Sequence, residues 1–220
     1  MTQDAQDRAQ LYRALTEAGP STRLQAALFA GTHPGTLPVE TLIDRCAVEP
    51  DFFVRDTLSW ALTRYDPLIT VDLLLAELRS PVPQARSQAL HTLSKIGDQR
   101  AWEAVTGFLR DEDDEIARTA WRAAARLVPE GSEAELIGTL ITQLGRGDAE
   151  VQRSLSRALA SLGEPALPAL ARFLSHPDPA VRSHAIATER LIQHPDEGLA
   201  AAIAEANRIV ALQGAPTIEE

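Results

Sequence analysis

Four arginines have the spacing that most plainly suggests a binding site in this sequence. Arg118 and Arg122 are four residues apart, and Arg153 and Arg157 repeat that spacing further along the chain. Residues four apart lie on one face of an α-helix, where like charges mildly destabilise it. Guanidinium groups bind carboxylates and phosphates through paired hydrogen bonds. If both stretches are helical, the pattern favours a surface that binds an anionic group.

Local ion pairing is the other interpretation of these arginines. Asp114, Glu115 and Glu150 are close enough in sequence to neutralise them within the chain. Trp60 presents a similar choice, because an exposed Trp is often an interface hot spot, whereas a Trp between stacked helices only fills the core. The sequence leaves both interpretations open.

The histidines and the cysteine do not show the spacing of a catalytic or metal site. The histidines stand at positions 33, 91, 176, 184 and 194; none is followed by Glu, and no two are four residues apart. Cys46, the single cysteine, is more typical of a small buried side chain than of a reactive thiol. The chain also has no glycine-rich phosphate loop and no nucleophile elbow. We therefore expect a non-enzyme without a cofactor.

Composition narrows the class of protein further. The formal net charge of −10 disfavours non-specific binding to nucleic acids or to anionic membranes. No run approaches the ~18 apolar residues of a membrane span, and the polar N-terminus has no signal core. Lys95 is the only lysine, which together with many Ala, Gly and Pro residues suggests a GC-rich bacterium. We expect a cytoplasmic, soluble protein.

An internal repeat predicts how these residues are positioned. The stretch Asp178-Pro-Ala-Val-Arg-Ser-His-Ala185 recurs in weaker forms, with anchor positions at 22, 54, 85, 116, 151 and 181. In this stretch, Asp178 can cap a helix, and Pro179 is tolerated in its first turn. A period of about 31 residues is typical of stacked helical repeats.

Hydrophobic spacing and Gly or Pro breaks predict an all-α chain. The expected helices cover residues 4–18, 21–30, 38–46, 51–65, 69–78, 83–96, 99–110, 114–127, 133–144, 149–162, 165–174, 179–193 and 197–213. These form about six helix pairs plus a C-terminal capping helix. We expect a single domain over residues 1–214 and a flexible tail over 215–220.

The motif Asp-x-x-Val-Arg-x-x-Ala at the start of each second helix resembles the HEAT repeats. It is most similar to the short bacterial HEAT-like class that also occurs in phycobilisome lyases, and the resemblance covers residues from about 20 to 193. It implies an α-α superhelix. It also implies a ladder of Asp and Arg side chains between repeats, through Arg55, Arg86 and Arg182, interrupted where Ala117 and Gln152 hold the motif position.

The resemblance leaves several functions open, because this fold includes scaffolds, chaperone-like factors and a few enzymes. Nothing marks a bilin site, and the His-Glu pairs of deoxyhypusine hydroxylase are missing. The HEAT-like alkylpurine DNA glycosylases need a basic cleft, which the net charge disfavours. A protein-interaction scaffold is the leading interpretation, with a transcription regulator or an enzyme as the partner. The alternatives are a metal- or cofactor-dependent enzyme and a nucleic-acid-binding protein.

The expected binding surface follows from the second helix of each pair, which lines the concave side of HEAT-type stacks. Counted from the anchor at 100° per residue, positions +2, +6 and +9 face outward. We expect a partner protein or its acidic segment to contact Asp56, Trp60, His91, Arg118, Arg122, Arg153, Arg157 and Arg190. Trp121, at position +5, is expected in the seam between pairs, partly buried and partly wet.

Overall fold

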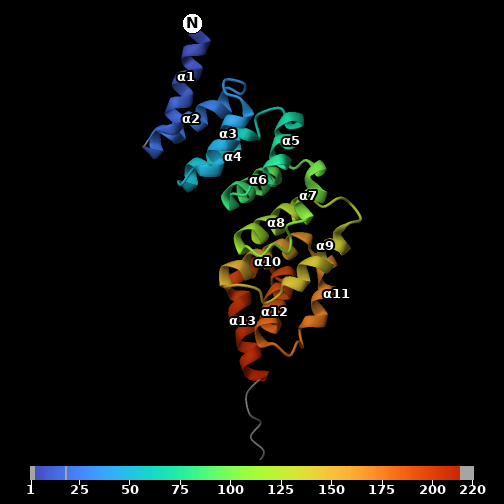
Figure 1. Cartoon of the computed structure of the whole chain (residues 1–220). Helices are drawn as coiled ribbons and strands as arrows, with labels where there is room; N and C mark the ends of the chain where they lie inside the picture. The colour runs from blue at the N-terminus through green and yellow to red at the C-terminus, as the bar shows by residue number, and fades with distance from the viewer. Residues whose placement is uncertain (1–2, 18, 214–220) are drawn as a thin grey trace, which may run out of the picture. The chain divides into compact units, whose positions relative to one another are not determined.

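The computed structural model describes residues 3–17 and 19–213, which contain helices and turns but no strand (Figure 1). The fold is the predicted α-α solenoid of HEAT-like helix pairs. The chain divides into two compact units, Met1–Thr106 and Gly107–Glu220, which we describe separately. The single domain over 1–214 stays a prediction, and the expected tail over 215–220 lies outside the described residues.

The N-terminal unit stacks helix pairs through their second helices. Helix α2 packs against α4, and α4 packs against α6. Their core is filled mainly by Leu and Ala, as the low aromatic content predicts. The elements are α1 (Gln3–Thr16), α2 (Pro20–Thr32), α3 (Val39–Val48), α4 (Phe52–Leu62), α5 (Pro67–Glu77), α6 (Pro83–Ile96), the 3₁₀ turn η1 (Gln99–Ala101) and α7 (Trp102–Thr106). The helix predicted over 99–110 ends before Gly107, a poor helix former.

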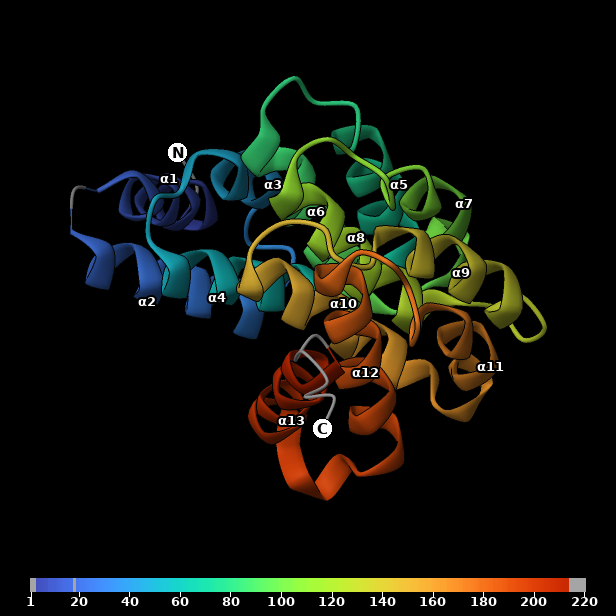
Figure 2. The same cartoon turned by 90° about the horizontal axis from the view of Figure 1, so that it is seen from below.

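The C-terminal unit continues the same pattern and ends in the predicted capping helix. Figure 2 shows α13 lying against α12, where its Ala202 and Ala206 are buried. Helix 165–174 is broken into short pieces, since Pro168 lacks a backbone donor. The elements are α8 (Asp114–Leu127), α9 (Glu133–Leu140), η2 (Ile141–Gln143), α10 (Ala149–Leu162), η3 (Glu164–Ala166), α11 (Leu167–Leu170), η4 (Ala171–Phe173), α12 (Pro179–Gln193), η5 (Pro195–Glu197) and α13 (Gly198–Gln213).

The motif arginine ties each second helix to the turn that precedes it. Its Nη1 donates to the backbone carbonyl six residues earlier: Arg55 to Glu49 (2.8 Å), Arg86 to Ser80 (2.9 Å) and Arg182 to His176 (2.5 Å). The motif Asp instead caps the helix, as when Asp51 Oδ1 accepts from the backbone N–H of Phe53 and Val54. The expected Asp–Arg ladder between repeats is therefore wrong: the arginine satisfies carbonyls of its own repeat.

Other side chains take this role where the motif lacks arginine. The side chain of Ala117 has no hydrogen-bond donor. Instead, Arg146 from the next repeat donates its Nη2 to the carbonyl of Asp111, six residues before Ala117 (2.5 Å). In the following repeat, Gln152 Nε2 reaches the carbonyls of Gly145 (3.4 Å) and Gly147 (3.3 Å). The turn carbonyls thus stay paired although the sequence motif is interrupted.

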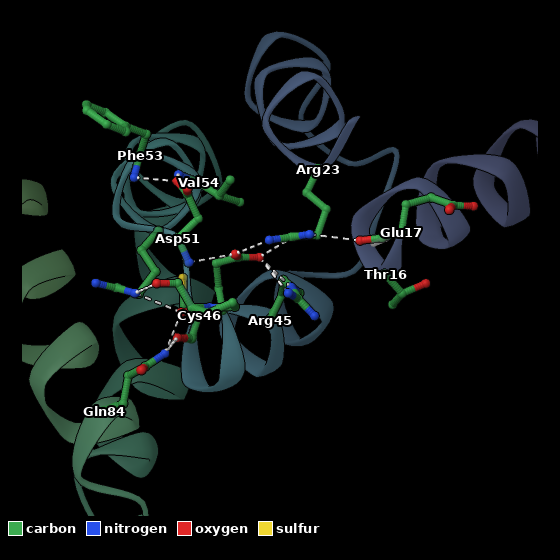
Figure 3. Close-up of polar contacts among 12 residues, drawn as sticks. Thr16, Glu17, Arg23, Arg45, Cys46, Asp51, Phe53, Val54 and Gln84 are labelled. Atoms are coloured by element: carbon green, nitrogen blue, oxygen red, sulfur yellow. Dashed lines mark hydrogen bonds and ion pairs between the residues drawn. The ribbon is translucent and has the colours of Figure 1, made fainter. Parts of the chain in front are cut away.

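A buried ion-pair cluster holds the N-terminal unit together around Glu49 (Figure 3). The fully buried carboxylate accepts from Arg23 Nη2 (2.7 Å), from Arg45 Nη2 (2.6 Å) and from the backbone N–H of Asp51 (2.9 Å). Burial by itself acts to raise the pKa of Glu49, but these hydrogen bonds outweigh it and lower the pKa to about 2. Glu49 is therefore an ionised group that links α2, α3 and α4.

A neutral histidine is the corresponding buried polar group of the C-terminal unit. His184 on α12 accepts the backbone N–H of Gly145 at Nδ1 (3.0 Å), so its proton is on Nε2. Nε2 in turn lies 3.0 Å from the carbonyl of Gln152 and 3.1 Å from Ser156 Oγ. Burial lowers the pKa of His184 to about 4. The ring joins α12 to α10 and to the turn before α10.

Trp121 is more deeply buried than expected, since a partly exposed side chain was predicted for it. Its side chain is completely buried, and its indole N–H donates to the carbonyl of Leu109 (2.8 Å). The Arg146 guanidinium lies 5.8 Å from the ring centroid. Ser59, Leu90 and Ser156 at this position are also buried, and Ile186 is half-buried, so the seam excludes most water even where its side chains are polar.

Candidate functional site

Arg118, one of the four predicted arginines, is neutralised within the chain. Its Nε lies 2.7 Å from Glu115 Oε2 on α8, and its Nη1 donates to Glu150 Oε1 on α10 at 2.9 Å. Partial burial acts to lower the pKa of Arg118, but the two carboxylates outweigh it and raise the pKa. Arg118 therefore has the local carboxylate partners that the second interpretation expected, and it connects two neighbouring helices; its contact with a partner protein stays a prediction.

Arg122 and Arg157 come together one turn further along the same two helices. They line an open hollow of about 480 Å³, together with Arg126, a residue that the sequence analysis did not select. The rest of the lining is small: Ala125 on α8, and Ala158 and Ser161 on α10. No carboxylate is among the residues that line the hollow, in contrast to the surroundings of Arg118.

The electrostatics of the hollow are those of crowded cations. Partial desolvation of its guanidinium lowers the pKa of Arg122, and the positive charges of Arg118 and, less strongly, Arg157 lower it further, while Glu115 acts in the opposite direction. Arg122 Nη2 donates to the hydroxyl of Thr119 at 3.2 Å, which offers no compensating charge. An anion in the hollow would relieve this repulsion.

The dipoles of α8 and α10 favour acidic side chains at their N-termini and basic side chains at their C-termini. Asp113 and Asp148 cap the N-termini of α8 and α10, where the helix dipole favours negative charge. Arg126 lies in the last turn of α8, where the dipole favours positive charge, whereas Arg122 and Arg157 lie further from the helix ends. Arg146 Nε pairs with Asp114 Oδ1 (2.8 Å) and ties the two N-termini together.

The other predicted site residues are divided between the two units. In the N-terminal unit, Asp56 pairs with Lys95 (2.6 Å) and lies 3.5 Å from His91 Nε2, which brings two predicted residues together. Trp60 is 36% exposed, and its ring packs against Gly31 of α2. In the C-terminal unit, Arg153 on α10 and Arg190 on α12 are half-buried and do not line the hollow.

Arg126 was missed although the sequence carried a signal for it. It lies at position +10, outside the +2, +6 and +9 columns. Arg118, Arg122 and Arg126 nevertheless form one run with a spacing of four, which places all three along a single helical stripe. Extending the stripe by one turn identifies it.

The remaining reactive residue types are occupied in other ways. Burial raises the pKa of the Cys46 thiol to about 12, which makes it a poor nucleophile. His33 stacks on Phe29, and His176 Nδ1 accepts from the backbone N–H of Asp178. Within residues 3–17 and 19–213, no three His, Cys, Asp or Glu side chains gather in a way that suits a metal ion. Nor does any helix of these residues combine the length and low polarity of a bilayer crossing.

Comparison with protein families identifies the repeat. The sequence pattern of the HEAT repeats matches residues 71–136 and 137–197, which together make up more than half of the chain. The chain belongs to the HEAT-repeat family. A search of curated protein sequences finds no significant match.

Solved structures of similar fold include HEAT-like and armadillo proteins. The complex of CpcE and CpcF of phycocyanin lyase from Nostoc matches with a TM-score of 0.50 and 17% identity, over 97% of this chain and 90% of that chain. Human deoxyhypusine hydroxylase matches with a TM-score of 0.46 and 18% identity, over 94% and 96% of the two chains. A designed armadillo repeat protein matches with a TM-score of 0.43 and 16% identity, over 83% and 98%. At such identities the likeness concerns the fold alone.

Proposed function

We propose that this HEAT-repeat protein is a non-catalytic interaction module, and that it binds an acidic segment of a partner protein in the hollow between α8 and α10. The observation that carries the proposal is the lining of that hollow by Arg122, Arg126 and Arg157 without any carboxylate. This site replaces the four-arginine set expected from the sequence, since Arg118 is already paired.

The chemistry of the lining favours carboxylates as ligands. A guanidinium presents its donors as a planar fork that matches a carboxylate, and Arg is enriched among interface hot spots. Each bound carboxylate would also reduce the repulsion that lowers the pKa of Arg122. One or two Asp or Glu side chains in sequence would match the guanidinium groups of Arg122 and Arg157 in charge.

The lining favours binding over catalysis. It contains no His, Asp, Glu or Cys side chain that could act as a general base. The hydroxyl of Ser161 donates to the carbonyl of Ala158 at 2.8 Å rather than to a catalytic partner. Stacked repeats commonly serve as extended binding surfaces for other proteins, and the CpcE–CpcF structure is itself a complex of two proteins.

A fluorescent peptide of eight glutamates tests this proposal by anisotropy with the purified full chain. We expect saturable binding that weakens as salt is added. The double variant R122E/R157E should bind at least about tenfold more weakly, because removing a hot-spot contact costs more than 1 kcal/mol. This variant should fold, since a glutamate at position 122 would lie four residues from both Arg118 and Arg126.

Arg172→Glu is the charge-matched control for the single variants R122E and R157E, because Arg172 is exposed in the same unit but does not line the hollow. Its affinity for the peptide should match that of the wild type. Equal binding by wild type and by folded R122E/R157E would contradict the proposal. So would tighter binding of a single-stranded oligonucleotide than of the peptide, which would instead support a nucleic-acid-binding role.

A further inference from the structure

One edge of the N-terminal unit exposes large apolar side chains at the turn between α3 and α4. Phe52 and Phe53 are 64% and 70% exposed, and Val48 at the end of α3 is exposed as well. The two phenylalanine rings meet edge to face, with their centroids 5.6 Å apart. Figure 3 shows the Phe53 ring pointing away from the polar cluster around Glu49. These side chains contribute little to the core of their own unit.

The next turn, before α6, extends this apolar surface. Gln84 Nε2 donates to the carbonyls of Cys46 and Glu49, each at 2.9 Å, and so holds the start of α6 against the end of α3. Val82, two residues before Gln84, is exposed. We use the name apolar edge for Val48, Pro50, Phe52, Phe53, Pro81 and Val82, all of which are exposed.

The carbonyl groups of Glu49, Pro50 and Ser80 in these turns are already hydrogen-bonded. Arg55 Nη1 donates to the carbonyls of Glu49 and Pro50, at 2.8 Å each. Arg86 Nη1 donates in the same way to Ser80 (2.9 Å). A buried carbonyl without a partner is costly, so turns usually need water. Here the water can be removed without leaving these acceptors unpaired.

The N–H groups of Asp51, Phe53, Val54 and Val82 are paired as well. Asp51 Oδ1 accepts from the N–H of Phe53 (2.9 Å) and of Val54 (3.1 Å). The N–H of Asp51 donates to Glu49 Oε1, and that of Val82 lies 3.3 Å from Ser80 Oγ. The apolar edge is therefore an ordered surface that can be desolvated at little polar cost, which is a property of interfaces.

We propose that the apolar edge binds the apolar edge of a second copy of this chain, forming a two-fold symmetric dimer. A two-fold interface places the same patch against itself, so a charged patch would repel its own copy. None of the six residues of the apolar edge is ionisable, Glu49 is fully buried, and the half-buried carboxylate of Asp51 accepts from the N–H groups of Phe53 and Val54 that it caps. An uncharged apolar patch is thus its own complement.

The area of the patch sets the expected strength of the dimer. With about 200 Å² for the surface of a Phe residue, the exposed shares of Phe52 and Phe53 amount to roughly 270 Å². A standard interface buries about 800 Å² on each partner. The valines and prolines bring the edge closer to that value without reaching it. We therefore expect a reversible dimer in the micromolar range.

The corresponding turn of the C-terminal unit does not fit this interface. There, Glu112, Asp114 and Glu115 hold the positions of Pro50, Phe52 and Phe53, counted back from the anchors Ile116 and Val54. Two such turns would repel each other across a two-fold axis. Self-association is therefore assigned to the N-terminal unit, and it is independent of the arginine hollow.

Sedimentation velocity of the purified full chain over a range of concentrations tests the proposal. The wild type should shift from monomer to dimer as the concentration rises. Phe52→Asp and Val82→Asp should each weaken the dimer about tenfold or more by burying a charge. Both variants should remain folded, because Asp is favourable in the first turn of a helix and at an N-cap.

Leu68→Asp is the matched control, since Leu68 is an equally exposed apolar residue at the start of α5, outside the apolar edge. It should dimerise like the wild type. A wild type that stays monomeric throughout would overturn the proposal, as would dimers that persist in both F52D and V82D. Loss of the dimer in L68D as well would also overturn it, because the edge would then not be the specific interface.

Discussion

The two units of this protein use charge in opposite ways. The N-terminal unit buries an ionised carboxylate, Glu49, and exposes apolar side chains such as Phe52 and Phe53. The C-terminal unit buries a neutral imidazole, His184, and exposes arginines around a hollow. Among the residues whose burial is described, every highly exposed large hydrophobic side chain lies in the N-terminal unit.

This difference shows that two units with the same repeat architecture can use different buried polar groups to link their helices. In both units the turn carbonyls are paired by arginine or glutamine side chains, so the backbone requirement is the same. The other side chains that link neighbouring helices can differ between the units. The surface then varies with it, from an apolar edge suited to another chain of the same kind to a cationic hollow suited to an acidic segment.

Removing the charge of Glu49 should have the largest effect on stability. Glu49→Gln keeps the shape of the side chain but leaves Arg23, which is also buried, without a counter-ion. Breaking a buried ion pair in this way costs about 3–5 kcal/mol. Urea unfolding should show the loss, and hydrogen exchange should locate it in α2, α3 and α4.

Glu150→Gln provides the comparison within the other unit. Its carboxylate pairs with Arg118 but is largely exposed, so the loss should be at most about 1 kcal/mol. Similar losses in the two variants would show that burial of charge does not distinguish the units. A loss below about 1 kcal/mol for E49Q would remove the ion-pair cluster as the anchor of the N-terminal unit.

Acid should weaken the two units in different pH ranges. The folded pKa of His184, about 4, lies below its ordinary value of 6.5, so the unfolded chain takes up the proton first. Its stabilising effect is complete above pH 6.5 and is lost as the pH falls toward 4, by about 3 kcal/mol in total. Glu49 acts in a lower range, because its pKa is lowered from 4.5 to about 2.

Urea unfolding between about pH 7.5 and about pH 5.5 measures the effect of His184 before Glu49, which is protonated in the unfolded chain from about pH 4.5 downward, contributes. The wild type should lose stability over this range, with faster hydrogen exchange in α10 and α12. His184→Gln removes the titrating group and should flatten the dependence on pH. An equally steep dependence in H184Q would assign the acid sensitivity to other groups.

Helix periodicity and Gly or Pro breaks were sufficient to predict most elements of this fold. Helices 83–96, 114–127, 149–162 and 179–193 coincide with the structure at both ends. The errors arise where a helix is not the lowest-energy state for the whole stretch. Gly107 ends one predicted helix early, and Pro168 divides another into 3₁₀ and α turns.

The candidate site was harder to predict, because a helical wheel gives direction but not partners. It placed Arg118 and Arg122 on the same outward stripe, yet the carboxylate of Glu150 on the next helix reaches only the first of them. The acceptor of Arg55, a backbone carbonyl, leaves no trace in the pattern of side chains. The pairing of Arg23 with Glu49, 26 residues away, likewise depends on tertiary structure.

Two glycines test on a smaller scale how closely the helices of each unit are packed. A Cβ added to Gly31 of α2 would lie 2.3 Å from Trp60 Cζ3 and 2.9 Å from the Cα of Ala61. Because one of these atoms belongs to the backbone of α4, Gly31→Ala should cost about 1–3 kcal/mol, as overpacking does.

Gly138 of α9 has no atom within 4 Å of an added Cβ, so Gly138→Ala should stabilise the chain by about 0.5–1 kcal/mol. Urea unfolding measures both changes, and a red shift of tryptophan emission in G31A alone would report displacement of Trp60 from α2. If G31A is as stable as the wild type, the Trp60–Gly31 contact does not fix the spacing of α2 and α4, and the predicted role of Trp60 as a binding residue gains weight over its packing role.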